Sequence, residues 1–253
     1  MASSRTTRIV TTSWDDGDIR DLRIAELLQA RGLGATFYVP IQPLNGNPSL
    51  GKNELRSLGT SGFEIGCHGI AHETMSEVPL EKLAYIVSTC KAIHEDSLGQ
   101  RVRMFCYPRG RYTSHVVEAL KRAGYQGART VRLLATEADY GPYDLPTSAQ
   151  AYPHSRTEYL RNITRSREVH RLYDYVARLG CDDDWVEIGR KLFDRVFCHG
   201  GVWHLWGHSW EIDELGLWDE VRELLDYVSR RDDVLYLNNG DLVQRLAHFP
   251  AAA

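Results

Sequence analysis

The chain has 253 residues, of which 43% are hydrophobic and 25% are charged. This length and composition support a sizeable buried core and favour one domain, residues 1–253, over two. The formal net charge of −4 argues against nucleic acid as a partner, because domains that bind it usually carry a basic surface. No run approaches the roughly 18 apolar residues of a membrane span, and residues 1–8 lack an apolar signal segment, so we expect a cytoplasmic protein. The sequence leaves the oligomeric state undetermined.

Hydrophobic periodicity predicts strands that alternate with helices along most of the chain. The expected strands are residues 8–12, 35–39, 63–65, 102–105, 202–206 and 234–237. The expected helices lie around residues 22–28, 80–93, 116–120 and 217–228. The apolar face of the second helix should comprise Leu80, Leu83, Ile86, Cys90 and Ile93. Such alternation predicts a mainly parallel sheet, either closed into a barrel or open and doubly wound.

Residues 130–200 fit this alternation poorly. Residues 147–154 are typical of a loop, and the segment that follows is helical and rich in arginine: Arg156, Arg161, Arg165, Arg167 and Arg171. One interpretation is a solvated helix face. The other is a cap over the functional site, in which arginine guanidinium groups bind an anionic part of a ligand.

Two adjacent carboxylates, Asp15 and Asp16, come directly after the first expected strand. They are compatible with a solvated turn that caps a helix. Alternatively, they share the work of one site, with one carboxylate binding a metal ion and the other acting as a base, because a nearby cation relieves their mutual repulsion.

Two histidines four residues apart, His68 and His72, follow the strand near residue 65. The pattern is not that of a zincin, because Gly69 rather than glutamate follows the first histidine. With Asp16 the two imidazoles form a plausible three-ligand site for a divalent ion, which favours Zn²⁺ over Co²⁺, Ni²⁺ or Mn²⁺. A cysteine–zinc site using Cys67 is disfavoured, since neighbours in a strand point to opposite faces.

Two further segments end expected strands, residues 105–110 (FCYPRG) and residues 202–208 (VWHLWGH). The carboxyl ends of parallel strands meet on one rim of a barrel, so the side chains that follow all four strands could converge. His208 follows the last of these strands, whereas His204 lies within it and should point sideways or into the core. The five cysteines are odd in number and lack Cys-x-x-Cys spacing, which is typical of reduced thiols.

These four segments, in this order, resemble the motifs of polysaccharide deacetylases with a NodB-homology domain, the carbohydrate esterase family four type. The resemblance covers most of the chain and implies a distorted (β/α) barrel of about seven strands, with a helical insertion near residues 150–200. It implies that Asp15 is the catalytic base and that Asp16, His68 and His72 bind the metal. The implied enzyme is a metal-dependent hydrolase that removes an N-acetyl or O-acetyl group from a carbohydrate.

The resemblance also implies roles for the later motifs. His208 would be the catalytic acid, with His204 as the alternative. The loop of Tyr107, Pro108, Arg109 and Gly110 would hold the acyl oxygen through a backbone N–H. Apart from the resemblance, the aromatic residues that cluster near the last motif include Trp210, which follows His208 and whose indole could line the sugar site.

The chain departs from the family pattern at Cys106, where many members carry an arginine that supports the base. Arg109 or Arg111 could replace it from the neighbouring loop. The departure keeps two alternatives open: a hydrolase of a formamide or cyclic amide, and an inactive carbohydrate-binding homologue. A cytoplasmic location would suit a small sugar, an oligosaccharide, or a nucleotide-linked or lipid-linked sugar as substrate.

Overall fold

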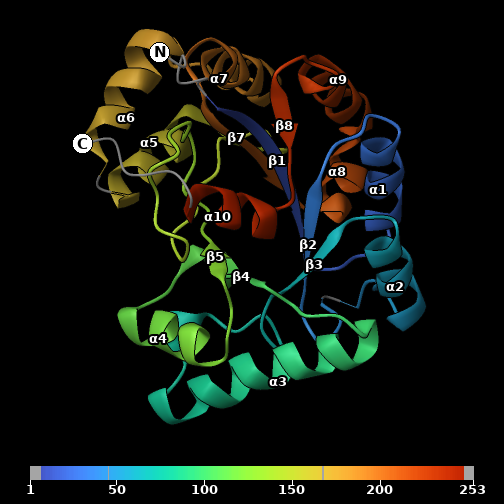
Figure 1. Cartoon of the computed structure of the whole chain (residues 1–253). Coiled ribbons are helices and arrows are strands. Elements are labelled where there is room, and N and C mark those ends of the chain that lie inside the picture. The colour runs from blue at the N-terminus through green and yellow to red at the C-terminus, as the bar shows by residue number, and fades with distance from the viewer. Residues whose placement is uncertain (1–6, 45, 167, 248–253) are drawn as a thin grey trace, which may run out of the picture.

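The computed structural model describes residues 7–44, 46–166 and 168–247, which form a curled parallel sheet covered by helices (Figure 1). Seven strands follow the order β5-β4-β3-β2-β1-β7-β6, and β8 pairs with β1 off this path. The strands are β1 Arg8–Asp15, β2 Ala35–Val39, β3 Glu64–Cys67, β4 Met104–Cys106, β5 Gly127–Arg129, β6 Ala149–Gln150, β7 Gly201–Gly207 and β8 Val234–Tyr236. This half-barrel confirms the predicted distorted (β/α) barrel.

The connections between these strands are mostly helical. The helices are α1 Asp21–Gln29, α2 Lys52–Thr60, α3 Leu80–Leu98, α4 Ser114–Arg122, α5 Arg156–Ser166, α6 Val169–Tyr173, α7 Trp185–His199, α8 Ser209–Leu215, α9 Trp218–Val228 and α10 Asn239–Ala247. Short turns of helix add η1 Met75–Glu77, η2 Pro108–Gly110 and η3 Asp174–Arg178. No helix in the described ranges has the length and apolar character needed to cross a bilayer.

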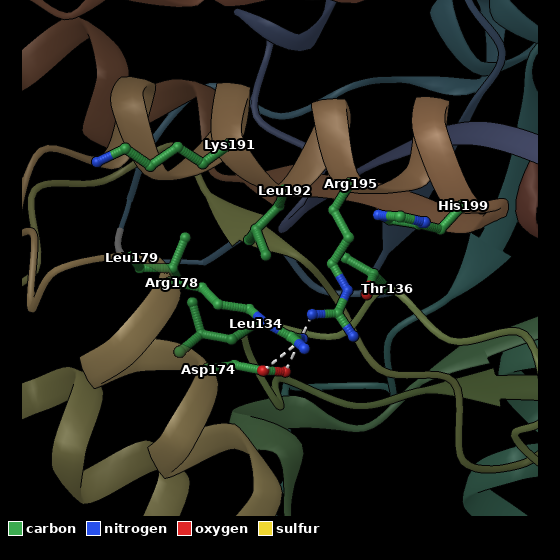
Figure 2. Close-up of a pocket in the computed structure, with 9 residues that line it drawn as sticks. All are labelled: Leu134, Thr136, Asp174, Arg178, Leu179, Lys191, Leu192, Arg195 and His199. Carbon is green, nitrogen blue, oxygen red and sulfur yellow. Dashed lines mark hydrogen bonds and ion pairs between the residues drawn. The ribbon is translucent and has the colours of Figure 1, made fainter.

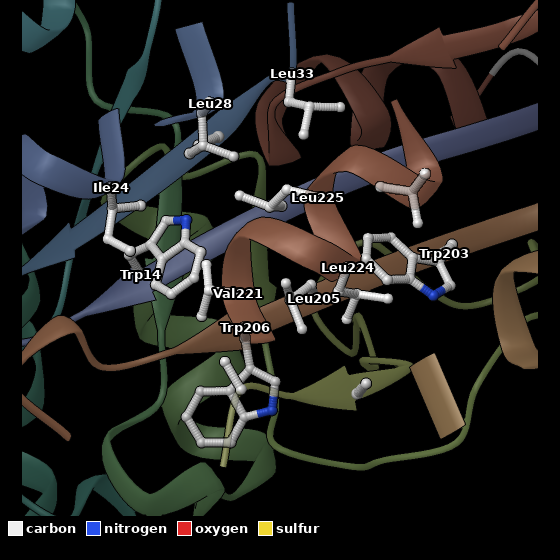
Figure 3. Close-up of a cluster of buried hydrophobic side chains, with 14 of the residues drawn as sticks. Trp14, Ile24, Leu28, Leu33, Trp203, Leu205, Trp206, Val221, Leu224 and Leu225 are labelled. Carbon is white, nitrogen blue, oxygen red and sulfur yellow. The ribbon is translucent and has the colours of Figure 1, made fainter. Parts of the chain in front are cut away.

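The core lies where helices cover both sides of the central strands. Trp14 of β1 and Trp203 of β7 are completely buried, and side chains of α1 and α9 gather around them in Figure 3. The indole Nε1 of Trp203 donates to the Gly189 carbonyl at 2.8 Å, so this tryptophan belongs to the core. The packing holds β1 and β7 side by side, and both strands deliver site residues.

Several sequence predictions need correction. Residues 147–154 are not all loop, because they contain the two-residue strand β6. In α3, Leu80 and Ile93 are exposed. The buried stripe is shifted around the helix and is made of Leu83, Ile86, Val87, Cys90 and His94. The helices α2, α8 and α10 and the strand β5 escaped prediction, because short segments with mixed polarity carry too little periodicity.

The region near residues 150–200 is the predicted helical insertion, built from α5, α6, η3 and α7. Arg156, Arg161 and Arg165 are exposed, as expected for a solvated face. Arg171 is 1% exposed and donates to the Leu133 carbonyl and the Tyr140 hydroxyl, so it is a structural residue. The predicted Arg167 lies outside the described residues.

Candidate active site

The side chains that follow four parallel strands converge on one cavity of about 450 Å³ at the carboxyl rim of the sheet. Asp15 ends β1, and His68 and His208 directly follow β3 and β7. Seven predicted site residues line the cavity: Asp15, Asp16, His68, His72, Arg109, His208 and Trp210. Its apolar wall consists of Leu44, Ala71, Val131 and Trp206. The convergence expected from strand ends is therefore present.

Asp16, His68 and His72 form a cluster whose donor atoms fit a divalent ion. The Oδ1 atom of Asp16 lies 3.7 Å from Nε2 of His68 and 3.7 Å from Nε2 of His72. This oxygen is buried, and it has no hydrogen-bond partner among the described residues. A buried carboxylate oxygen is costly without a partner, and two imidazoles with a carboxylate are a suitable ligand set for zinc.

The environments of His68 and His72 keep both imidazoles neutral, the form that binds a metal ion. Nδ1 of His68 lies 3.0 Å from the Cys106 carbonyl, which accepts its hydrogen and leaves the Nε2 lone pair facing Asp16. Burial lowers the pKa of His68. Burial and the neighbouring His68 lower the pKa of His72 to about 4. Both rings are therefore uncharged at neutral pH and can bind a cation.

Cys67 does not take part in this cluster. Its sulfur groups with Cys90 and His94 on the side of α3, whereas the next residue, His68, faces the cavity. The alternation of side chains along β3 accounts for this split. The five cysteines are free thiols.

The cluster predicts a specific loss of metal binding. Replacing His72 by Ala should weaken the affinity for Zn²⁺ by about 100-fold or more, because even outer-shell partners of metal ligands are worth 10–100-fold. Competition with a chromophoric chelator measures the change. His115→Ala removes an exposed histidine of α4 and should leave the affinity unchanged; an equal loss in both variants would contradict the assignment.

Asp15 is the second carboxylate, and its partner is a residue that the sequence did not reveal. The Arg129 guanidinium, completely buried at the end of β5, forms an ion pair with Asp15. Burial pushes the pKa of Asp15 upward, but the charge of Arg129, helped by His68 and His208, outweighs burial and lowers it. Asp15 is therefore anionic at neutral pH, with Oδ2 4.0 Å from Nε2 of His68.

Arg129 replaces the arginine that the family pattern places at position 106. Cys106 of β4 pairs with Arg129 of β5 in the sheet register, and its sulfur lies 3.6 Å from Oδ2 of Asp15. The cation thus comes from the neighbouring strand. Neither loop candidate does this, because Arg109 binds Thr74 and Arg111 pairs with Glu77.

The two histidines of the last motif, His204 and His208, have different environments. His204 is buried within β7, its Nε2 lies 2.8 Å from the Ser13 hydroxyl, and burial lowers its pKa to about 3. His208 lines the cavity at the start of α8. Its Nδ1 donates to Glu211 at 2.6 Å and its Nε2 lies 3.8 Å from Oδ2 of Asp16. Burial opposes the charge of His208, but Glu211 and Asp16 prevail and raise its pKa to about 9.

The loop of residues 107–110 contributes less than the resemblance implies. Within this loop Tyr107 and Pro108 are buried, and neither lines the cavity. The N–H of Tyr107 donates to the Arg129 carbonyl and that of Gly110 to the Tyr107 carbonyl. Proline has no N–H, so Arg109 supplies the one backbone donor of this loop without a partner among the described residues.

Two other features mark the cavity as a functional site. Asp16, His72 and Arg109 all have positive φ angles of 77°, 55° and 57°, a costly conformation that concentrates at functional sites. Trp210 lines the wall, and its indole Nε1 donates to Oδ2 of Asp16 at 3.1 Å. This bond orients the carboxylate, a role that sequence reasoning missed.

A second cavity of about 400 Å³ lies beside the amino end of β7, between η3 and α7 (Figure 2). Two of its arginines share one carboxylate within the protein, because Arg178 and Arg195 both pair with Asp174, at 2.7 and 3.4 Å. None of the predicted site residues lines it. The exposed Arg161 and Arg165 line neither cavity, which favours the solvated helix face over the arginine-rich cap.

Comparison with known proteins agrees with the fold and the motifs. Residues 2–128 match the family model described as polysaccharide deacetylase. Since this match covers half of the chain, the protein belongs to the polysaccharide deacetylase family, and its fold is of the NodB-homology type. A comparison with curated proteins found no match.

Solved structures share this fold at low identity. A protein of Mycobacterium smegmatis assigned as a polysaccharide deacetylase is 14% identical, with a TM-score of 0.66 over 100% of this chain and 96% of that one. A family 4 carbohydrate esterase of Streptomyces lividans, solved with acetate, is 12% identical, with a TM-score of 0.54 over 91% and 92%. A family 4 pseudoenzyme of Bacillus anthracis is 16% identical, with a TM-score of 0.55 over 94% and 66%.

Proposed function

We propose that the protein is a metal-dependent hydrolase that removes an N-acetyl or O-acetyl group from a carbohydrate. The observation that carries the proposal is the unpartnered, buried Oδ1 of Asp16, which faces two imidazole nitrogens beside the second carboxylate, Asp15. Asp16, His68 and His72 would hold the ion, with Zn²⁺ favoured and Co²⁺, Ni²⁺ or Mn²⁺ as other candidates. When bound, such an ion polarises the acyl carbonyl and lowers the pKa of water.

Different residues of the protein carry out the two proton transfers of the reaction. Asp15, held anionic by Arg129, accepts the proton of the attacking water. The N–H of Arg109 donates to the oxygen that becomes negative. His208, positively charged at neutral pH, donates a proton to the leaving amine or alcohol. The two transfers need opposite protonation states, and the environments of Asp15 and His208 favour these states.

The position of Arg129 bears on the alternatives. The interpretation as a formamide or cyclic-amide hydrolase depended on a missing arginine beside the base, and Arg129 supplies that cation from β5. The pseudoenzyme match keeps an inactive carbohydrate-binding homologue as the contrary outcome.

The test is a mass-spectrometric screen for acyl loss from N- and O-acetylated sugars, oligosaccharides and nucleotide sugars, with Zn²⁺ and with chelator. We expect loss of one acetyl group that chelator abolishes and that the His72→Ala variant lacks. Sugar binding without acyl loss, in protein shown to hold metal, would overturn the proposal and favour the inactive homologue.

Glu211 should set the alkaline limit of activity. His208 acts in its protonated form, so kcat/KM should fall as the pH rises through its pKa. Glu211→Gln removes the main group that raises this pKa, and the alkaline limb should move to lower pH by about one unit or more. The matched control Glu214→Gln changes an exposed acid of the same helix and should leave the pH profile unchanged.

A further inference from the structure

Arg109 differs from every other charged residue that lines the active-site cavity, because no counter-charge accompanies it. Asp15 is paired with Arg129, and His208 is paired with Glu211. Oδ2 of Asp16 lies 3.8 Å from Nε2 of His208, which is positively charged. Among the described residues, no carboxylate lies within ion-pair distance of Arg109, whereas its neighbour Arg111 pairs with Glu77.

The side chain of Arg109 is also held in place. Its Nη1 donates to the hydroxyl of Thr74 at 2.8 Å, and Thr74 is itself buried. The backbone of Arg109 adopts a positive φ of 57°, a conformation that a non-glycine residue adopts at a cost. Arg109 is exposed and lines the cavity, so its guanidinium is open to a ligand. The hydroxyl uses only part of the five-donor guanidinium, and the remaining N–H groups are available to a ligand.

The cavity has the size and composition of a site for one or two sugar units. Its volume of about 450 Å³ lies within the range of small-molecule sites, and its wall includes Trp206 and Trp210. His72 and Arg109 line the same space, so a substrate whose acyl group reaches the metal cluster lies within reach of the guanidinium.

We infer that Arg109 selects substrates in which the acylated amino sugar carries an anionic group, a carboxylate or a phosphate. This inference rests on the proposed function, whose substrate class it narrows. Arginine suits the task because its planar fork binds either oxyanion through two parallel hydrogen bonds. Neutral acetylated sugars would leave this cation without a partner.

The experiment compares kcat/KM for N-acetylglucosamine, its 6-phosphate and an N-acetylated amino-uronic acid, using the zinc-loaded wild type and its variants. The wild type should prefer at least one anionic substrate by about 10- to 100-fold, the value of a charge-assisted contact. Arg109→Gln should lower that preference by the same factor, and Arg109→Lys should restore part of it. Arg111→Gln, which removes an exposed arginine of the same loop, should leave the preference unchanged.

Comparing the 6-phosphate with the amino-uronic acid identifies which anion is recognised. An unchanged anionic-to-neutral ratio in Arg109→Gln, or a wild type that prefers the neutral sugar, would overturn the inference while the deacetylase proposal stands. Isothermal titration calorimetry with the same three sugars measures binding independently of turnover. Anion-dependent binding that requires Arg109, without turnover of any sugar, would support anion recognition and contradict the deacetylase proposal.

Discussion

Replacing Asp15 by Asn should lower kcat by about 10²–10⁴-fold, the usual contribution of a general base. The amide has the same shape but cannot accept the proton of the attacking water. Asp15 is not among the three residues proposed to hold the ion, so the variant should keep the metal content of the wild type. Single-turnover acetate release and metal analysis of the same sample measure the two quantities together.

The Asp15→Asn variant also breaks the buried ion pair with Arg129, so its stability must be measured together with its activity. The Asp15→Asn substitution leaves Arg129 with no carboxylate, and removing one partner of a buried pair costs about 3–5 kcal/mol. The variant should therefore unfold at a lower urea concentration than the wild type. Activity must be compared well below that midpoint. Activity near the wild-type level in folded, metal-loaded protein would refute the role of Asp15 as the base.

Replacing Arg129 by Met should lower the stability of the protein and also change the pH dependence of its activity. The loss leaves Asp15 as an unpaired buried carboxylate, which again costs about 3–5 kcal/mol in the free energy of unfolding. Without the guanidinium charge, burial raises the pKa of Asp15. The base then becomes protonated at a higher pH, so the acidic limb of kcat/KM should move upward.

Two further variants isolate the charge from the packing. Arg129→Lys keeps a cation and should keep the acidic limb closer to that of the wild type. The double variant Asp15→Asn/Arg129→Met removes both charges, so its loss of unfolding free energy should be smaller than the sum of the two single losses. An additive double-mutant cycle, or an unmoved acidic limb in Arg129→Met, would contradict the assigned role of Arg129.

The strand-end positions in the site were accessible from the sequence. Asp16, His68 and His208 each directly follow an apolar segment of strand-like composition, and parallel strands bring such positions to one rim. The i to i+3 spacing of His208 and Glu211 is also a local signal, but it becomes informative only when α8 is known to begin at Ser209. Short helices of mixed polarity lack the periodicity that would reveal them.

Arg129 had no comparable signal. Its strand is three residues long, and its partner Asp15 lies 114 positions away in the sequence. The register of β4 and β5 places Arg129 beside Cys106, and this register depends on the packing of the whole sheet. The departure at Cys106 was visible in the sequence, but the compensating residue was not.

The amino-acid order alone specifies the parallel α/β architecture and the types of side chain at the strand ends, because periodicity and strand-end chemistry are local properties of the chain. Packing in three dimensions establishes that Arg129 supports Asp15, that His204 is buried while His208 faces the cavity, and that Arg109 rather than Arg161 or Arg165 lies at the site. Each of these outcomes depends on burial and charge pairing between distant segments, which arise when the strands take up their register.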